Sequence, residues 1–292
     1  MTLAIDHNDP TLRGHAEAYS REMAAKRRQT LLGAVVFIAC VLLAAYGAEV
    51  DPAKFAENAW RFPKYILEIM PTLRPATFFS DLKEWYWNLN GWLKLLWQTL
   101  LIAYVGTLLG AVGGFLLCFT ASANLGSGWV RWGTRRFLEF CRTVPEIVFA
   151  LIFVIAFGLG PLPGVLAIAI HTMGAMGKLF SEVVENIDMK PVDGMTATGA
   201  TWWQTIRFAV VPQVLSNFAS YALLRFEINV RGASIMGFVG AGGIGQDLIE
   251  AIRKFYFTDV SAILFLIILT VMLIDYGTER LRHALLSLEH RQ

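Results

Sequence analysis

Charged side chains are scarce in this chain of 292 residues. Asp, Glu, Lys and Arg make up 16% of the sequence, whereas soluble domains contain about 25%. Hydrophobic residues make up 55%, and no charge occurs in 29–48, 95–130, 147–177 or 260–274. So few polar side chains cannot cover a water-soluble body of this size, and uncharged stretches of this length are typical of membrane spans. The composition therefore predicts an all-α integral membrane protein.

Cysteine is rare as well, and the sequence lacks the motifs of several enzyme classes. Cys40, Cys118 and Cys141 lie in or beside apolar runs, without a CxxC pair or a histidine nearby in sequence. There is no HExxH motif, no pair of intramembrane aspartates and no Ser/His dyad suggested by spacing. We therefore expect no catalytic residue and no metal site. The net charge of +2 comes from scattered lysines and arginines, so we expect no nucleic-acid partner.

Nucleotide-binding patterns are either absent or out of context. The sequence has no GxxxxGK[ST] loop, so we expect this chain to bind no ATP and no other cofactor. Gly240, Gly242 and Gly245 match GxGxxG, but only about 20 residues separate the flanking apolar stretches, and a dinucleotide-binding βαβ unit needs about 30. Together with Gly243, these glycines are expected to form a turn or a tight helix crossing at the outer membrane surface.

The apolar stretches predict about six transmembrane helices. A bilayer core of about 30 Å requires about 20 helical residues at 1.5 Å per residue. Gly and Pro residues between 158 and 164 divide one long stretch into a hairpin. The predicted spans are 30–48, 96–121, 143–160, 164–184, 212–237 and 258–279. A cleaved signal peptide would have an apolar region of only about 7–15 residues, so the first stretch is expected to remain as a span.

The positions of lysine, arginine and the aromatic residues predict the topology. Lys26-Arg27-Arg28 directly precedes the first span, and several arginines lie in the loop 122–142. By the positive-inside rule, both termini are cytoplasmic, the first as a tail over 1–29. Segment 49–94 is then periplasmic. Its tryptophans and tyrosines predict a helix over 78–92 that lies along the membrane surface.

One polar segment, 185–212, resembles the cytoplasmic EAA loop of ABC importer permeases. That pattern is E-A-A, three residues, Gly, nine residues and then I-x-L-P. Asp193, Gly194 and Met195 occupy the E-A-A positions, Gly199 the glycine and Pro212 the proline. Gly and Met replace both alanines. The alternative interpretation of the segment is an ordinary polar loop between two spans.

A broader similarity extends over about residues 92–282, in several ordered blocks. These blocks resemble the phosphonate-importer branch of type I ABC permeases: Gly158-Leu-Gly-Pro161, His171-Thr172, Val192 to Ala200, Tyr221 to Glu227, Val239 to Gly245, and Glu250-Ala-Ile-Arg253. The resemblance implies a homodimer, two cytoplasmic ATPase subunits that carry the ATP and Mg, and a periplasmic phosphonate-binding protein. It also implies that 185–212 is the loop that couples to the ATPase. Members of the family also import phosphite and other phosphate-like anions.

Charged residues inside the fifth predicted span require a partner or water. Each charge at the centre of a bilayer costs about 2.5–3.5 kcal/mol on insertion scales. Glu227 and Arg231 are four residues apart and predict an ion pair on one helix face. Arg225 points elsewhere, because it lies about 200° around the helix from Glu227. It is predicted to line a path for the anion, or else to pair with Glu146. His171 is expected to be a hydrogen-bonded residue of the core.

These observations leave three candidate functions. The first is the permease subunit of an ATP-driven phosphonate importer, with Arg225, Glu227, Arg231, His171 and Glu146 as candidates for the translocation path. The second is the same architecture importing phosphite or another phosphate-like anion. The third is a secondary transporter or channel that needs no ATPase, although no inverted repeat is evident in the sequence.

Overall fold

A computed structural model describes the backbone of residues 10–289 and the side chains of residues 19–284. All regular elements in this described part are helices. Within the described residues, four helices are long and apolar enough to cross a membrane, and a bent pair of helices forms a fifth candidate. The chain divides into two compact units between Tyr65 and Ile66, and each is described separately here.

The first unit contains one long helix and a short one. α1 spans Pro10–Gly47, and its apolar candidate span is Tyr19–Gly47. The predicted boundary at residue 30 is therefore not a structural boundary, because Lys and Arg are good helix formers and the helix continues through them. Residues 1–9 of the predicted tail lie outside the described residues. α2 (Pro52–Asn58) begins at Asp51, whose carboxylate accepts from the amides of Ala53 and Lys54, and α3 (Arg61–Ile69) crosses the boundary between the units.

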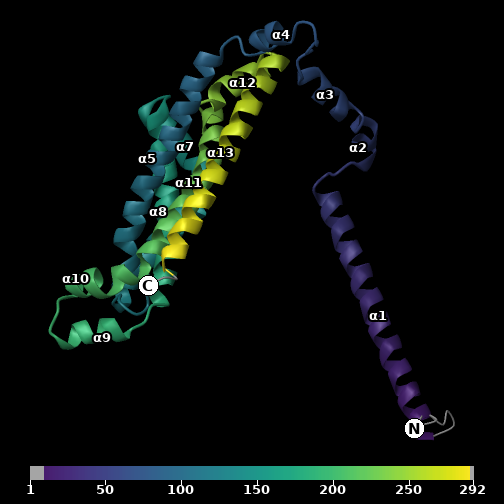
Figure 1. The fold of residues 1–292 in the computed structure, drawn as a ribbon. Coiled ribbons are helices and arrows are strands. Elements are labelled where there is room, and N and C mark those ends of the chain that lie inside the picture. Colours follow the sequence, from purple (N-terminus) through teal and green to yellow (C-terminus); the bar gives the residue numbers. More distant parts are fainter. Residues whose placement is uncertain (1–9, 290–292) are drawn as a thin grey trace, which may run out of the picture. The chain divides into compact units, whose positions relative to one another are not determined.

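The second unit is a bundle in which long helices run side by side (Figure 1). Its long members are α5 (Leu89–Ala121), α8 (Pro161–Glu185), α11 (Val211–Met236) and α13 (Phe257–Glu289). Its shorter helices are α4 (Phe78–Trp85), α6 (Gly128–Thr143), α7 (Glu146–Phe157), α9 (Lys190–Ala197), α10 (Trp202–Thr205) and α12 (Gly245–Arg253). We name the two ends of the bundle after α9 and α12, which lie at opposite ends in Figure 1.

Glycines bring α5 and α8 into close contact. Gly106, Gly110 and Gly114 repeat every fourth residue and therefore share one face of α5. A Cβ atom on Gly110 would lie 2.6 Å from the Cβ of Thr172, and one on Gly106 would lie 2.7 Å from a methyl carbon of Ile168. Small residues at this spacing allow helix backbones to approach closely in membranes. The prediction that the glycines of this span permit close helix packing is confirmed.

The third span was predicted as one helix over 143–160, and that was wrong. The structure has the 16-residue α6 and the 12-residue α7, bent by 85° at the break between them. The predicted loop 122–142 therefore contains most of a helix. α6 is amphipathic, with buried Leu138 and Cys141 on one side and exposed Trp129 and Trp132 on another. Its arginines mask this pattern in a search for apolar runs.

Two further boundaries differ from the sequence prediction. The aromatic helix predicted over 78–92 ends at Trp85, and α5 begins at Leu89, because a turn over 86–88 separates them. α11 matches the fifth predicted span, but it is not among the helices that are long and apolar enough to cross a membrane. The hairpin turn was predicted correctly: Gly158 and Gly160 have φ of 87° and 144° between α7 and α8.

Candidate functional site

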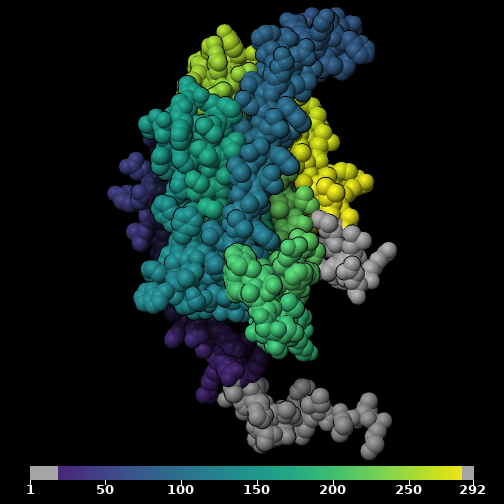
Figure 2. Space-filling model, turned by 90° about the vertical axis from the view of Figure 1, so that its left-hand side faces the viewer, coloured from purple at the N-terminus to yellow at the C-terminus, as the bar shows by residue number. Residues whose placement is uncertain are grey.

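The segment that resembles an EAA loop forms a protrusion at the α9 end of the bundle. The short helices α9 and α10 project there, drawn in green in Figure 2. Asp193 and Gly194 on α9 are exposed, Met195 is half-buried, and nothing lies within 4 Å of the position that a Cβ on Gly194 would take. The E-A-A positions thus lie on a helix with a free outer face, which has the geometry of a docking element.

Gly199 ends this helix in the conformation that its position in the motif predicts. Its φ is 78°, in the left-handed region. The Gly199 amide donates to the Thr196 carbonyl at 3.0 Å, and the Ala200 amide donates to the Met195 carbonyl at 3.3 Å. This pair of bonds is a Schellman motif, in which glycine is favoured because it has no Cβ. The predicted turn is therefore confirmed.

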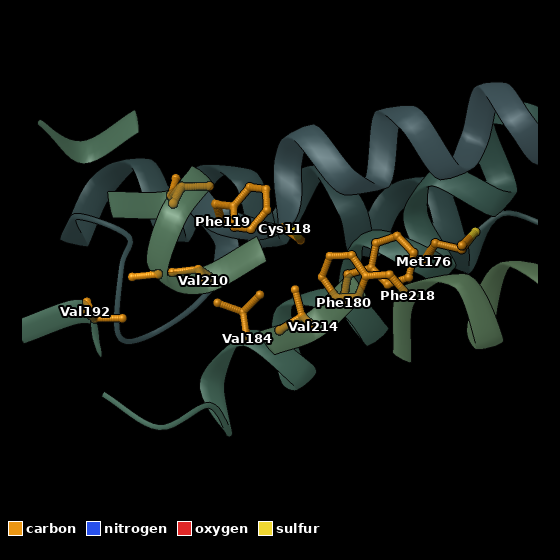
Figure 3. Close-up of a cluster of buried hydrophobic side chains, with 11 residues drawn as sticks. Cys118, Phe119, Met176, Phe180, Val184, Val192, Val210, Val214 and Phe218 are labelled. Atoms are coloured by element: carbon orange, nitrogen blue, oxygen red, sulfur yellow. The ribbon is translucent and has the colours of Figure 1, made fainter. Parts of the chain in front are cut away.

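A hydrophobic cluster anchors α9 to the bundle (Figure 3). Val192 is the buried residue of α9, and it packs with Ile206, Ala209 and Val210, which precede α11. Residues 206–210 form a π-helical turn directly before the exposed Pro212 in the first turn of α11. The ring nitrogen of Pro212 cannot donate a hydrogen bond, which favours such an irregular turn. Phe180 of α8 stacks on Phe218 of α11 in the same cluster, with centroids 3.9 Å apart.

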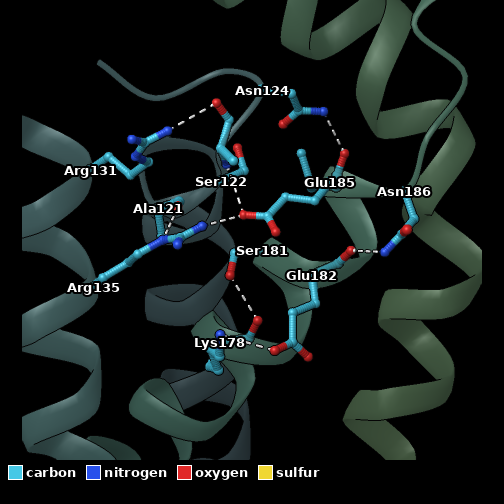
Figure 4. Close-up of polar contacts among 12 residues, drawn as sticks. Ala121, Ser122, Asn124, Arg131, Arg135, Lys178, Ser181, Glu182, Glu185 and Asn186 are labelled. Atoms are coloured by element: carbon cyan, nitrogen blue, oxygen red, sulfur yellow. Dashed lines mark hydrogen bonds and ion pairs between the residues drawn. The ribbon is translucent and has the colours of Figure 1, made fainter. Parts of the chain in front are cut away.

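Polar contacts join α8 to α6 at the same end (Figure 4). Arg135 of α6 forms an ion pair with Glu185, the last residue of α8, and also donates to the carbonyl of Ala121 at 2.7 Å. Glu185 accepts in addition from the Ala123 amide at 2.8 Å. Its partner Arg135 lies 50 residues away in sequence, so the local sequence around Glu185 gives no sign of this ion pair. Lys178 and Glu182 form their own pair at 3.0 Å.

The charged residues of α11 form an ion-pair network with α13. Arg231 lies 2.5 Å from Glu227, as their spacing predicts, and 2.8 Å from Asp275 of α13. The side chain of Glu227 is 15% exposed, whereas that of Arg231 is 48% exposed. Asp275 was missed as a partner because it lies 44 residues further along the chain. The network neutralises Arg231 but leaves it facing the outside of this single chain.

Arg225 lies apart from this network. Its Nε atom is buried and has no hydrogen-bond partner. Glu146, the first residue of α7, is the carboxylate whose charge acts on Arg225, but no ion pair joins them among the described side chains. Glu146 instead abuts α11 further along, where a Cβ on Gly232 would lie 2.5 Å from its Oε1. Arg225 is thus a charge in the bundle for which the described side chains provide no bonded counter-ion.

His171 is half-buried on α8 and is hydrogen-bonded, as expected. Its Nδ1 lies 3.1 Å from the carbonyl oxygen of Val144, in the bend between α6 and α7. The ring also experiences the charges of Arg225 and Glu146. His171, Arg225 and Glu146 therefore gather around one region of α7, α8 and α11, whereas Glu227 and Arg231 belong to the contact with α13.

A buried polar trio joins three helices, and the sequence did not reveal it. Asn229 of α11 is fully buried, and its amide donates to the hydroxyls of Thr107 on α5 at 2.8 Å and of Thr172 on α8 at 2.9 Å. Its Oδ1 has no partner. In a low-dielectric interior, such bonds fix the register of the helices strongly. The sequence around Asn229 does not indicate this trio, because both hydroxyls belong to helices that are distant in sequence.

The glycine-rich segment forms a tight turn. Gly240, Gly242 and Gly243 have φ of 82°, 84° and 83°, and Gly245 begins α12. The amide of Gly243 donates to Gln98 of α5 at 3.2 Å. A Cβ on Gly242 would lie 2.9 Å from the Cα of Pro161. The predicted turn is confirmed, and it packs between the starts of α5 and α8.

The first turn of α12 carries a carboxyl group with a shifted pKa. Partial burial, with a smaller effect of the nearby Glu250 carboxylate, raises the pKa of Asp247. Glu250 itself pairs with Lys254 at 2.5 Å, and that bond lowers its pKa. Among the described side chains, no group of three or more His, Cys, Asp or Glu is placed to hold a metal ion. The expectation that the chain binds no cofactor remains a prediction.

Comparisons with known proteins agree with this arrangement. The family described as "Binding-protein-dependent transport system inner membrane component" matches residues 106–285. The chain is 32% identical over 264 residues to the putative phosphite transport system permease protein HtxC of Stutzerimonas stutzeri, covering 90% of this chain and 89% of that one. It is 52% identical over 117 residues to the putative cryptic phosphonate transport system permease protein PhnE2 of Escherichia coli strain K12, covering 40% of this chain and 96% of that one.

The fold also matches a solved transporter. A chain of the MetNI methionine ABC transporter in an inward-facing conformation superposes with a TM-score of 0.56 at 21% sequence identity. The superposition covers 66% of this chain and 95% of that one. At this level of identity the likeness concerns the fold alone, which is that of a type I importer permease.

Proposed function

Because the chain belongs to the family of inner membrane components of binding-protein-dependent transport systems, we propose that it is the permease subunit of an ATP-driven phosphonate importer. The observation that carries the substrate class is that relatives within this family are named phosphonate and phosphite permeases. Both names denote small phosphorus oxyanions. A phosphite importer of the same architecture is the second candidate, favoured by the relative that covers most of the chain.

The arrangement of charges supports an anionic substrate. Arg225 lies about 20 Å along α11 from its first residue, at 1.5 Å per residue, and its Nε atom has no hydrogen-bond partner among the described side chains. In a path of low dielectric constant, one such charge attracts a dianion far more strongly than it would in water. We therefore assign Arg225 to the anion path and Glu227 and Arg231 mainly to assembly. His171 and Glu146 are assigned to the surroundings of Arg225.

The energy comes from partner chains in this proposal. Two ATPase subunits carry ATP and Mg, and α9 seats on one of them through the face that bears Asp193 and Gly194. The exposure of this face and the Schellman turn at Gly199 support the assignment. A second copy of the chain completes the permease. In this orientation, the α9 end and both termini are cytoplasmic, and the α12 end meets a periplasmic binding protein.

A self-contained secondary transporter is the alternative from a different class. Reconstitution distinguishes it from the proposal. The chain is placed in liposomes with its ATPase, with ATP inside and the binding protein outside, and uptake of methylphosphonate, phosphite and phosphate is measured. We expect uptake of methylphosphonate that stops when ATP or the binding protein is omitted. Uptake by the permease alone, driven by an ion gradient, would contradict the proposal, and uptake of phosphite only would favour the second candidate.

A further inference from the structure

One glutamine side chain connects the start of α9 to the start of α11. The Oε1 atom of Gln213 accepts from the Asp188 amide at 3.1 Å, and its Nε2 atom donates to the Asp188 carbonyl at 3.2 Å. Both main-chain polar groups of Asp188 are therefore bound by one side chain. Nε2 donates in addition to the carbonyl of Ala209 at 2.6 Å. Gln213 thus joins the loop before α9, the π-helical turn and α11.

Asp188 is itself part of the beginning of α9. Its carboxylate accepts from the Lys190 amide at 3.1 Å, which orients the first turn of the helix. α9 begins at Lys190, and α8 ends at Glu185, so only four residues, 186–189, separate the two helices. A displacement of the N-terminus of α9 therefore moves Asp188, and through Gln213 it acts directly on α11.

This link complements the hydrophobic anchor of α9. Val192, with the partly buried Met189 and Met195 beside it, attaches the helix to the residues that precede α11 through the cluster described above. Apolar contacts of this kind have no preferred direction, whereas hydrogen bonds orient the groups that they join. Beside Gln213 and Asp188 lies a hollow of about 520 Å³, also lined by Asn217 and Tyr221. Side-chain packing is therefore incomplete there, and the amide of Gln213 supplies the directional link between the two helices.

We propose that Gln213 is a positioning residue that transmits the movement of α9 to α11. The inference rests on the proposed function, since it assumes that an ATPase moves α9. The substitution Gln213→Met removes all three hydrogen bonds and keeps an unbranched side chain of similar length. Because the affected groups of Asp188 are exposed, water can replace the lost bonds, and we expect the folded complex to assemble.

The test compares ATP hydrolysis with and without the binding protein. Purified complexes of the full chain with its ATPase are placed in lipid nanodiscs, and the binding protein is loaded with methylphosphonate. For Gln213→Met, we expect the ratio of stimulated to basal hydrolysis to fall by about fivefold or more, in the range of allosteric couplings, at unchanged basal hydrolysis. A residue with a merely structural role would lower the amount of complex and leave this ratio unchanged.

Gln204→Met is the matched control. The Oε1 atom of Gln204 accepts from the amide and the hydroxyl of Thr201 at 2.7 and 2.9 Å, and both bonds stay within the cap of α10. This variant should keep the wild-type ratio. Gln213→Glu is a second probe of the same link, because a carboxylate cannot donate to the carbonyls of Asp188 and Ala209, and it should lower the ratio as well.

Three results would overturn the inference. A wild-type ratio in both Gln213 variants would show that the link transmits nothing. An equal loss in Gln204→Met would show that the effect is not specific to the link. A wild-type complex that the loaded binding protein does not stimulate would contradict the proposed function itself, and the inference with it.

Discussion

Two helix contacts of the bundle differ in the side chains that build them. α5 meets α8 through Gly106, Gly110 and Gly114. The first two of these glycines lie directly against Ile168 and Thr172 of α8. α11 and α13 meet through Glu227, Arg231 and Asp275, and the arginine is half-exposed. The first contact is tight and free of charge. The second is ionic and open on one side.

This difference suggests different roles: the α5–α8 contact forms a rigid scaffold, and the α11–α13 contact forms a surface for a partner or water. Closely packed interiors change little without strain, so α5 and α8 form the part that keeps its shape. Charges inside a membrane require protein or water beside them, so the face of α11 that carries Arg231 is expected to meet a second copy of the chain or a water-filled path. The segment with α9 and α10 joins α8 to α11 and so connects the two parts.

The largest effect is expected from a bulky residue in the tight contact. Gly110→Leu would force a side chain into Thr172 and the Ala169 carbonyl, whose oxygen lies 2.8 Å from the Cβ position. Overpacking lowers the free energy of unfolding by about 1–3 kcal/mol and occasionally more. Because a side chain and a main-chain carbonyl both block this position, we expect a loss of more than about 3 kcal/mol and almost no folded protein. Yield after size-exclusion chromatography measures this. Gly133→Leu on α6 is the control, since nothing lies within 4 Å of its Cβ position. Equal yields of the two variants would contradict the role of the α5–α8 contact as a rigid scaffold.

The ionic contact should respond in a graded way. Arg231→Gln leaves two carboxylates without a cation and should cost about 2 kcal/mol, within the range for hydrogen bonds to charged groups. Glu227→Gln should cost less, because Arg231 keeps Asp275. The double change should recover part of the loss, since only Asp275 then remains uncompensated. Thermal unfolding in detergent ranks the three variants. If Glu227→Gln proves the more damaging single change, the network is misassigned.

The connecting segment should affect coupling more than stability. Gly199→Val places a β-branched residue at φ of 78°, although no atom lies within 4 Å of the new Cβ. Left-handed backbone costs a residue with a Cβ about 1–2 kcal/mol, so the turn after α9 should shift. We expect assembled complex with several-fold weaker stimulation of ATP hydrolysis by the binding protein. Gly199→Asn, which tolerates this conformation, should stay close to wild type. Full stimulation of the valine variant would exclude a role for this turn.

Features set by neighbours in sequence could be predicted, and those set by distant partners could not. The turn at Gly158 and Gly160, the left-handed Gly199 and the pair Glu227–Arg231 depend on residues within a few positions of each other. Their geometry is local, so residue type and spacing were sufficient.

Three features depend on residues far apart in the chain. Asn229 meets Thr107 and Thr172 across 122 and 57 residues. Arg231 meets Asp275 across 44 residues. α6 was hidden because its arginines interrupt the apolar pattern, although Arg131 and Arg135 bond to main-chain carbonyls and Arg135 also pairs with Glu185 across 50 residues. A search for apolar runs treats such residues as a loop.

The most direct test of the account is anion uptake by Arg225→Gln. We assign this residue to the path of the anion, and the other charges of α11 mainly to assembly. Since Arg225 Nε has no bonded partner, the variant should fold at least as well as wild type. Uptake of methylphosphonate into liposomes, normalised to the amount of assembled complex, should fall at least about tenfold, corresponding to about 1.4 kcal/mol. Normal uptake per complex would contradict the assignment, and Arg225 would then be a contact between helices.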